Sequence, residues 1–457
     1  MHATWARRLL AGATSTLLVA AGLTAGAGAA QGSAPDRSST ATPSTATALA
    51  AVPDSFRIAG SGFGHGVGMP QYGAYELSRR GANGSDVLRY YYTGAQVLRM
   101  TTPATVSVQL YGPDPYAFAG YGDSSDTTYV HVTGGSWRLR TEQGDTVASG
   151  SGNTRFKVTT AGETADGRVR VRVDGKLFER DLLRLHWSGT RYYDAGGPDA
   201  LVDIDGSHGT YRHGRLTLTE REDIPNVVND LLLNTEYLYG LAEMPSSWGL
   251  NGGAGALRAQ AMAARSYALL KTQARNPACD CHLVDDVRDQ HFTGWDKENE
   301  GTGGRYGAVW KAAVNRTVDS STSALGLAYD GEPVAAHYYS SSGGRTADSE
   351  DVWASVVPYE RSVSDPYSKV APGNSYASWT RTITQAQAAD LFDLPVVVSI
   401  AVTSRWTSGQ ARTLVATNRR GTTSTITGKA DQIRAVLGAR TTAGSLPASW
   451  ITSIRPS

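Results

Sequence analysis

The sequence feature that most constrains the fold is a strict alternation of arginine and valine over residues 168–173. Successive side chains of a β-strand point to opposite faces, so the valines of this run would share one face. Asp174-Gly175 follows at once, and such a pair favours the tight turn of a β-hairpin. Short alternating runs between turns continue on both sides of this hairpin. We therefore expect a β-rich subdomain over residues 97–222.

Helical patterns lie outside this β-rich region. The longest covers residues 254–273, where Leu257 and several alanines form one face and allow close packing. Shorter helices are expected at 71–80, 85–91, 235–242 and 385–391, and a buried strand is expected at 333–339. The predicted fold class is α+β, with a helical catalytic core, mixed strands and an inserted β-rich subdomain.

The remaining segments divide the chain further. A positive start at Arg7 and Arg8, an apolar run and a close of small residues predict a signal peptide over residues 1–30, rather than a retained membrane anchor. A Ser/Thr/Ala/Pro-rich linker without a core of its own is expected at 31–52. The other two segments are a histidine-glycine motif segment that packs on the core, at 53–96, and the core with C-terminal strands, at 223–457. We expect a secreted protein without a membrane span after cleavage of the signal peptide.

Charge and cysteine content bear on the class of protein. Lys+Arg 43 against Asp+Glu 42 leaves a formal charge of +1, without the basic excess of a nucleic-acid binder. Cys279 and Cys281, the two cysteines of the chain, are separated by one residue. They could form a strained disulfide or join His282 or His291 in a zinc site, and their spacing leaves both alternatives open.

The first candidate for chemistry is Glu243, at the end of an apolar helical segment that Pro245 interrupts. Partial burial beside Met244 and Trp248 would raise the pKa of this carboxyl and keep it protonated, as a general acid requires. The alternative is a solvated helix-end glutamate. Spacing alone favours that alternative, because lone carboxylates are rarely catalytic.

Three further segments contain candidate binding residues. Alternate glycines from Gly62 to Gly68 surround His65, which either donates to a sugar oxygen or pins the loop structurally. Small hydroxyl residues after Tyr339 suit sugar binding, and the Gly-x-Ser-x-Gly pattern of a serine nucleophile is missing from them. Arg265 either clamps a substrate carboxylate or forms a supporting salt bridge. The substrate-binding candidates are His65, Gln71, Tyr72, Gln260, Arg265, Tyr267, Gln290, Ser342, Gly343 and Thr346.

These motifs together resemble the SpoIID/LytB family (stage II sporulation protein D and the amidase enhancer), over most of residues 56–440. Glu243-Met244-Pro245 is similar to the segment that carries the catalytic glutamate of the family. The other matching segments are 65–74, 88–94, 236–240, 256–267, 289–290, 342–346, 352–353 and 363–366.

The resemblance implies a lytic transglycosylase that acts on peptidoglycan glycan strands. Glu243 would protonate the glycosidic oxygen between N-acetylmuramic acid and N-acetylglucosamine. It would then act as base on the muramic C6 hydroxyl, which attacks C1 and leaves a 1,6-anhydro end. The LytB branch implies an alternative from another class, a non-catalytic wall-binding protein that stimulates a cell-wall amidase. The resemblance leaves open whether the role is sporulation or general wall turnover.

The chain departs from the family pattern in three places. The histidine-glycine signature at 65–74 usually ends the family domain but here precedes the other motifs, like a circular permutation. We therefore expect His65 to lie in the same cleft as Glu243. Pro70 stands where the family usually has serine. Some members bind zinc near the position of Gln290, but Asp289 replaces one of their cysteines here, so we expect no metal and no other cofactor.

Overall fold

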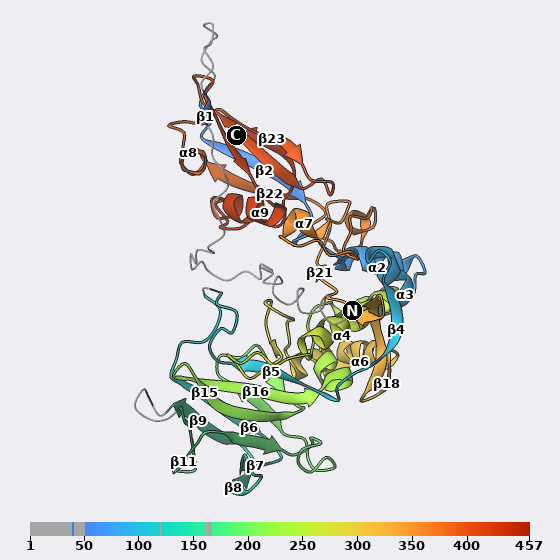
Figure 1. The fold of residues 1–457 in the computed structure, drawn as a ribbon, viewed down its shortest axis with the longest axis vertical. Coiled ribbons are helices and arrows are strands. Elements are labelled where there is room, and N and C mark those ends of the chain that lie inside the picture. Colours follow the sequence, from blue (N-terminus) through green and yellow to red (C-terminus); the bar gives the residue numbers. More distant parts are fainter. Residues whose placement is uncertain (1–38, 41–50, 119, 161, 163–166) are drawn as a thin grey trace, which may run out of the picture. The chain divides into compact units, whose positions relative to one another are not determined.

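The computed structural model describes residues 39–40, 51–118, 120–160, 162 and 167–457. The expected signal peptide and most of the expected linker lie outside the described residues. The chain forms two compact units, a first unit of Met1–Gln96 with Ala336–Ser457 and a second unit of Val97–Ala335. Helices take up 22% and strands 36% of the chain, so the mixed class is confirmed while the expectation of a helical core is wrong. Sheets make up most of the regular structure of both units (Figure 1).

Two sheets dominate the second unit. The first is seven-stranded, in the order β17 (Leu283–Val284), β5 (Thr105–Tyr111), β16 (Ile224–Leu232), β15 (Arg215–Arg221), β12 (Leu183–Trp187), β7 (Ser136–Thr141) and β8 (Thr146–Ser151). The second is six-stranded, in the order β11 (Lys176–Arg180), β10 (Val169–Val173), β9 (Thr154–Thr160), β6 (Thr127–Thr133), β13 (Leu201–Ile204) and β14 (Thr210–Tyr211). Trp137 of β7 meets Phe156 of β9 edge to face at 4.8 Å, so apolar faces of the two sheets pack on each other.

The alternating arginine-valine run forms the predicted hairpin. Val169 pairs with Arg180 and Val173 with Lys176, across β10 and β11. The two turn residues both have positive φ, 49° at Asp174 and 74° at Gly175. A two-residue turn with two positive φ angles matches the right-handed twist of the strands, and Asp-Gly adopts it readily.

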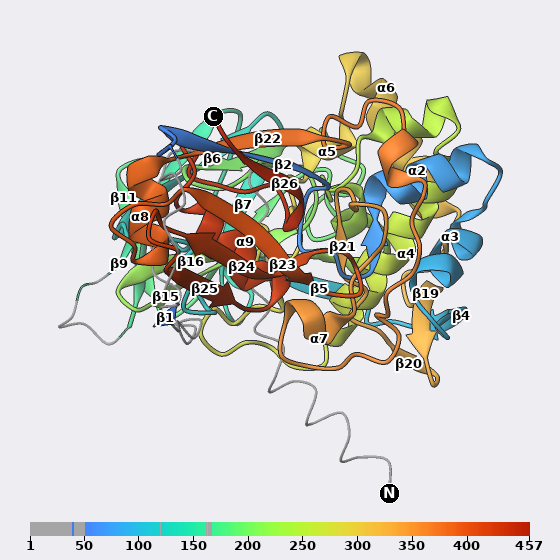
Figure 2. The same ribbon diagram turned by 90° about the horizontal axis from the view of Figure 1, so that it is seen from above.

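Helices and short strands complete the second unit. The predicted long helix is α4 (Ala254–Lys271), which packs on β19 and on two neighbouring helices (Figure 2). The predicted helix at 235–242 is formed in part, because the π-helix η1 is followed by helical residues 238–239 and a turn at Gly240. The elements of this part are β4 (Gln96–Thr101), η1 (Leu233–Tyr237), η2 (Ser246–Asn251), α5 (Trp295–Glu298), η3 (Thr302–Gly304), α6 (Arg305–Asn315), β18 (Val318–Ser320), β19 (Ser323–Tyr329) and β20 (Glu332–Pro333).

The first unit combines segments from both ends of the chain. β2 (Ser55–Ser61) lies between β22 (Trp379–Thr384) and β26 (Trp450–Pro456), as the blue and orange-red strands of Figure 1 show. β3 (Met69–Pro70) pairs in parallel with β21 (Tyr338–Tyr339). The expected strand at 333–339 is therefore reduced to two short pieces, β20 and β21.

An apolar core of the first unit includes Phe56, Ile383, Phe392 and Leu414. The described part of the unit has ten further elements. They are β1 (Ser39–Thr40), α2 (Gln71–Arg79), α3 (Gly84–Tyr91), α7 (Ser349–Val352), η4 (Ser368–Val370), α8 (Gln385–Phe392), β23 (Ser399–Arg405), β24 (Ala411–Thr417), β25 (Thr423–Thr427) and α9 (Ala430–Gly438). α2, α3 and α8 confirm three of the predicted helices. Across the described residues, no helix is both long and apolar enough to cross a membrane.

Candidate functional site

Glu243 is held by a short antiparallel bridge between two loops of the second unit. Leu241 pairs with Phe292. The amide of Ala242 donates to the carbonyl of His291 at 2.8 Å, and the amide of His291 donates to Oε1 of Glu243, also at 2.8 Å. The carboxylate is half-buried. The contact with the main chain of His291 helps to fix the position of this carboxylate, which suits a group that must meet a reacting atom.

The segment after Glu243 is fixed by a buried lysine. The ammonium of Lys297 donates to the carbonyl of Met244 at 2.6 Å and to Oε2 of Glu300 at 2.6 Å. The hydroxyl of Ser246 donates to the same oxygen of Glu300 at 2.5 Å. Burial lowers the pKa of Lys297, while the Glu300 carboxylate acts in the opposite direction. Glu243 thus lies between two fixed points, the His291 bridge and the Lys297 contact.

An aromatic layer supports the bridge from within the unit. The Tyr237 ring lies 5.3 Å from the Phe292 ring, and its hydroxyl donates to Oε1 of Gln290 at 2.8 Å. Burial raises the pKa of Tyr237 well above its usual value, so the hydroxyl remains a donor. Gln290, a predicted substrate ligand, is 1% exposed and turns its carbonyl toward Tyr237. These contacts favour a supporting role for Gln290.

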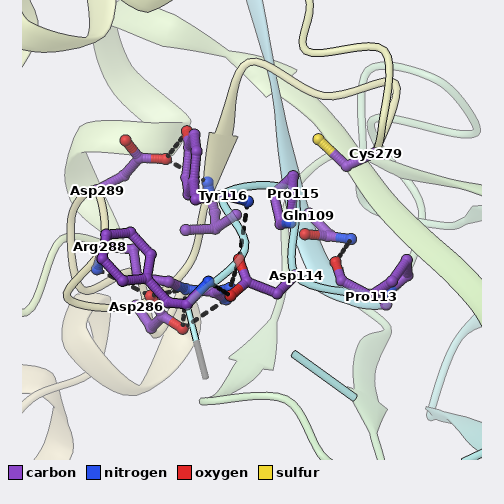
Figure 3. A network of polar contacts seen from close by, with 12 residues as sticks. Gln109, Pro113, Asp114, Pro115, Tyr116, Cys279, Asp286, Arg288 and Asp289 are labelled. Carbon is purple, nitrogen blue, oxygen red and sulfur yellow. Dashed lines mark hydrogen bonds and ion pairs between the residues drawn. The ribbon is translucent and has the colours of Figure 1, made fainter. Parts of the chain in front are cut away.

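Asp289, in the loop that leads to His291, has four hydrogen-bond or ion-pair partners. Its Oδ1 accepts from the hydroxyl of Tyr267 and pairs with the ammonium of Lys271, both at 2.7 Å. Its Oδ2 accepts from the hydroxyl of Tyr116 at 2.7 Å and from the amide of Val284 at 2.9 Å. Figure 3 shows the Tyr116 ring turned toward this carboxylate. Tyr267, another predicted substrate ligand, is 8% exposed and its hydroxyl serves Asp289.

A second set of charges ties the loop of Asp114 to the same segment. Arg288 pairs with Asp114 at 2.7 Å and with Asp286 at 2.8 Å, and its side chain is almost buried (Figure 3). Asp114 also accepts from the amide of Tyr116 at 2.9 Å. The loop after β5 is thereby fastened to residues 286–289, directly before the residues that hold Glu243.

Sequence reasoning missed an ionisable cluster beside His291. Nδ1 of His208 lies 3.2 Å from Oδ1 of Asp285, and the His208 ring is 5.9 Å from the His291 ring. The hydroxyl of Tyr211 donates to the other oxygen of Asp285 at 3.3 Å. Burial raises the pKa of Asp123, a neighbouring carboxyl, to about 6. His208 and Asp123 belong to loops of the two sheets, and no local spacing in the sequence marks them.

The contacts of Arg265 favour a structural role. The guanidinium is 0% exposed and donates to Asn234 Oδ1 at 3.0 Å, Thr317 Oγ1 at 3.1 Å and the carbonyl of Leu325 at 2.7 Å. Burial lowers the pKa of Arg265 to about 9. These contacts favour neither alternative raised from the sequence, because the partners are neutral and no surface is left for a substrate carboxylate. Gln260, on the same helix, is also 0% exposed.

We expect Arg265→Met to destabilise the folded chain by about 2–4 kcal/mol, because it leaves several buried acceptors unpaired. The acceptors of Asn234 and Leu325 would lose a charged donor at once. Arg316→Met is the control, since Arg316 is exposed at the end of α6 and should change stability by less than about 0.5 kcal/mol. Urea unfolding measures both. Equal midpoints for the two variants would contradict a structural role for Arg265.

His65 uses both ring nitrogens within the first unit. The amide of Val67 donates to Nδ1 at 3.0 Å, and Nε2 lies 3.1 Å from the carbonyl of Tyr338. The residue is 2% exposed, and burial, with the nearby His337 adding to it, lowers its pKa well below the usual value. A neutral ring with Nε2–H as donor satisfies both contacts. They favour the alternative in which His65 pins the glycine loop.

The other predicted ligands in the first unit cluster around the same loop. Phe63 bridges to Ser341, which joins the glycine loop to the hydroxyl-rich loop. The hydroxyl of Ser342 donates to Asp365 at 2.5 Å, and a Cβ added at Gly343 would lie 2.2 Å from Cγ of Trp450. The three other predicted ligands are Gln71, 9% exposed at the start of α2, Tyr72, whose hydroxyl donates to Gly373, and Thr346, which is buried and accepts from Val363.

The predicted site residues therefore fall into two groups. Glu243, Gln260, Arg265, Tyr267 and Gln290 belong to the second unit, and the remaining six belong to the first. Within each unit the structure brings segments far apart in sequence together. That His65 and Glu243 line one cleft stays a prediction.

The two cysteines form a disulfide with each other, beside Val228 in the second unit. This settles the alternatives left open by their spacing, because both sulfurs are used in the bridge. Nδ1 of His282 accepts from the amide of Ser107 at 3.0 Å. In the described part of the chain, no three His, Cys, Asp or Glu side chains are grouped as a metal site would require.

A family model matches the segment around Glu243. Residues 222–321 match the SpoIID family, described as stage II sporulation protein. Stage II sporulation protein D of Bacillus subtilis (strain 168) is 31% identical over 159 residues, 33% of this chain and 43% of that protein. The amidase enhancer of the same organism is 31% identical over 148 residues, 32% of this chain and 16% of that protein.

A third relative, stage II sporulation protein D of Bacillus amyloliquefaciens, is 31% identical over 143 residues, 30% of this chain and 40% of that protein. The chain spans less than half the length of each of these relatives. No solved structure matches the chain.

Proposed function

Because the chain contains a SpoIID family domain, we propose that it is a peptidoglycan lytic transglycosylase with Glu243 as its catalytic residue. It cleaves the bond between N-acetylmuramic acid and N-acetylglucosamine and leaves a 1,6-anhydro product. The observation that carries the proposal is the placement of Glu243 inside the matched segment, half-buried and held by the amide of His291.

A single carboxylate can serve this reaction because the nucleophile is part of the substrate. The acid step delivers a proton to the glycosidic oxygen, and the base step removes one from the C6 hydroxyl that attacks C1. Ordinary glycoside hydrolases need a second carboxylate at a set distance, to activate water or to form a covalent intermediate.

The protein is secreted and associated with the cell wall in this proposal, and its partner is the glycan strand of peptidoglycan. The expected signal peptide is the basis for export.

Product analysis of purified sacculi tests the proposal. Incubation with the chain should release glycan fragments that end in 1,6-anhydromuramic acid, seen by mass spectrometry as masses one water below the hydrolysed form. Fragments with free reducing ends would point to hydrolysis instead. Release of nothing at any enzyme concentration would overturn the proposal.

The match to the amidase enhancer of Bacillus subtilis favours a second candidate function. In that case the chain binds glycan without cleaving it and raises the rate of a cell-wall amidase. A reconstituted assay with amidase and sacculi separates the two. Stimulation that is equal with the unaltered chain and with Glu243→Gln, and no glycan cleavage by either, would support the enhancer.

Gly240→Ala should impair cleavage by moving the bridge that holds Glu243. A Cβ at this position would lie 2.4 Å from the Phe292 ring and 2.7 Å from Cα of Gly294. Overpacking of this kind costs about 1–3 kcal/mol. We expect the rate on sacculi to fall by more than about tenfold, because a small displacement of a catalytic group has a large effect.

The control for this variant is Gly196→Ala, at a glycine where an added Cβ has no neighbour within 4 Å. It should retain the rate and the unfolding midpoint. If Gly240→Ala unfolds at a lower denaturant concentration yet cleaves at the full rate, the bridge does not position the catalytic group.

A further inference from the structure

The loop that carries His208 is fastened to the segment that holds Glu243. It connects β13 to β14, and Thr210 forms a bridge with Gly294. Gly209 lies so close that an added Cβ would be 2.3 Å from the carbonyl of Thr293. His291, three residues before Gly294, donates its amide to Glu243. The β-rich subdomain therefore places His208 next to the segment that holds Glu243.

One ring nitrogen of His208 is held by a carboxylate, and the other is available to contact a ligand. Nδ1 faces Oδ1 of Asp285 at 3.2 Å, and the Asp285 side chain is 6% exposed while that of His208 is 45% exposed. Tyr211 fixes the second carboxylate oxygen. Within the described part of the chain, Nε2 of His208 has no hydrogen-bond partner. A histidine oriented by a buried carboxylate, with its other nitrogen open to a ligand, has the geometry of a general acid or base.

The charges around His208 favour its imidazolium form. The hydrogen bond to Asp285 raises the pKa of His208, burial opposes this, and the Asp285, Asp286 and Asp123 carboxylates add to the rise. The His291 ring, 5.9 Å from the His208 ring, is a further titratable neighbour, and burial lowers the pKa of His291. The donor at Glu243 is an amide, which stabilises a carboxylate more than a neutral carboxyl.

We propose that His208 is the general acid of the glycan cleavage and that Glu243 is its base. This inference rests on the proposed function and divides between two residues the steps that the one-carboxylate scheme gives to Glu243 alone. His208 and Glu243 both lie against His291, one at its ring and the other at its amide. They can therefore address two atoms of one sugar residue.

The step balances without a further reactant. The Nε2–H bond of His208 breaks and its proton goes to the glycosidic oxygen as the C1–O bond breaks. The C6 oxygen forms a bond to C1 and its proton goes to the Glu243 carboxylate. Solvent then returns a proton to His208 and takes one from Glu243.

The test compares natural and activated leaving groups. On sacculi, His208→Gln should lose about 10²–10⁴-fold in rate, the usual contribution of a general acid. On a glycan oligomer that ends in a muramyl 4-nitrophenyl glycoside, whose leaving group needs no proton, the same variant should lose less than about tenfold. Glu243→Gln should lose activity on both substrates. A purely structural defect would lower both rates of His208→Gln equally.

The matched control is His131→Gln. His131 pairs with Asp205 at 3.0 Å in the same six-stranded sheet and is likewise half-exposed. It should retain both rates. Asp285→Asn adds a second readout, because removing the carboxylate lowers the pKa of His208. In the pH–rate profile, the rate falls at high pH as His208 loses its proton. In Asp285→Asn this fall should move to lower pH.

The possible failures are distinguishable. If the unaltered chain cleaves neither substrate, the proposed function fails and the inference fails with it. If the unaltered chain cleaves sacculi but folded His208→Gln cleaves them at the full rate, the inference alone is overturned. An equal loss on both substrates, or an unmoved high-pH fall in Asp285→Asn, also overturns it.

Discussion

Glu243→Gln is expected to lower the rate of glycan cleavage by about 10²–10⁴-fold while the chain stays folded. Glutamine has nearly the shape of glutamate and keeps a carbonyl oxygen that can accept from the amide of His291. Glutamine cannot take up or release a proton, so every proton transfer that Glu243 makes in the reaction is lost. The rate on purified sacculi measures the effect, and the urea midpoint checks the fold.

Glu332→Gln is the control for this variant. Glu332 is an exposed glutamate of β20 in the same unit, and it should change neither the rate nor the midpoint. A folded Glu243→Gln variant that retains the full rate would contradict the catalytic role of Glu243. It would leave the amidase-enhancer function as the better account.

Asp289→Asn is expected to destabilise the second unit by about 3–5 kcal/mol, the usual cost of breaking a buried ion pair from one side. Asp289 accepts from Tyr267, Tyr116 and Val284 and pairs with Lys271. Asparagine would turn an amide donor toward these donors and leave the lysine without its counter-charge. Because the loop continues to His291, cleavage should fall together with stability.

Asp280→Asn is the matched control. Asp280 pairs with Arg275 at 2.9 Å, but both side chains are about two-fifths exposed. Exposed pairs contribute about 0–1 kcal/mol, so this variant should unfold almost where the unaltered chain does. Urea unfolding compares the two variants. Similar small shifts in both would show that the Asp289 network does not hold this part of the unit together.

Local patterns predicted those elements whose contacts are local. The alanine-rich stretch predicted as a helix over 254–273 forms α4, which ends at Lys271. Its small side chains at helical spacing let it pack closely against its neighbours. The arginine-valine run is the β10–β11 hairpin, because alternation and Asp-Gly agree with each other. Where local and long-range preferences agree, a sequence pattern is sufficient.

The expected strand at 333–339 is formed only at its two ends, and the expected helical core is wrong. The amide of His337 donates to the buried carboxylate of Glu360 rather than to a neighbouring strand, so the apolar run does not continue as β-structure. The core of the second unit consists of two facing sheets, whose pairing depends on contacts between distant segments. Sequence periodicity carries no information on such contacts.

The candidate site was predicted in part. Glu243 was identified because its flanking motif resembles a known family, while its spacing alone favoured a solvated residue. Arg265 and Gln290 fit the same motifs, but their burial favours supporting roles that only three-dimensional contacts reveal. His208 and Asp285 come together from the β-rich subdomain and the loop before His291, and nothing near either residue in the sequence connects them.

Digestion of purified sacculi in heavy-oxygen water tests the central claim most directly. In a lytic transglycosylase the C6 oxygen of the sugar replaces the leaving group, so no oxygen from water enters the product. The account predicts 1,6-anhydro ends without heavy oxygen, formed by the unaltered chain and lost in Glu243→Gln. New reducing ends that carry heavy oxygen would contradict it.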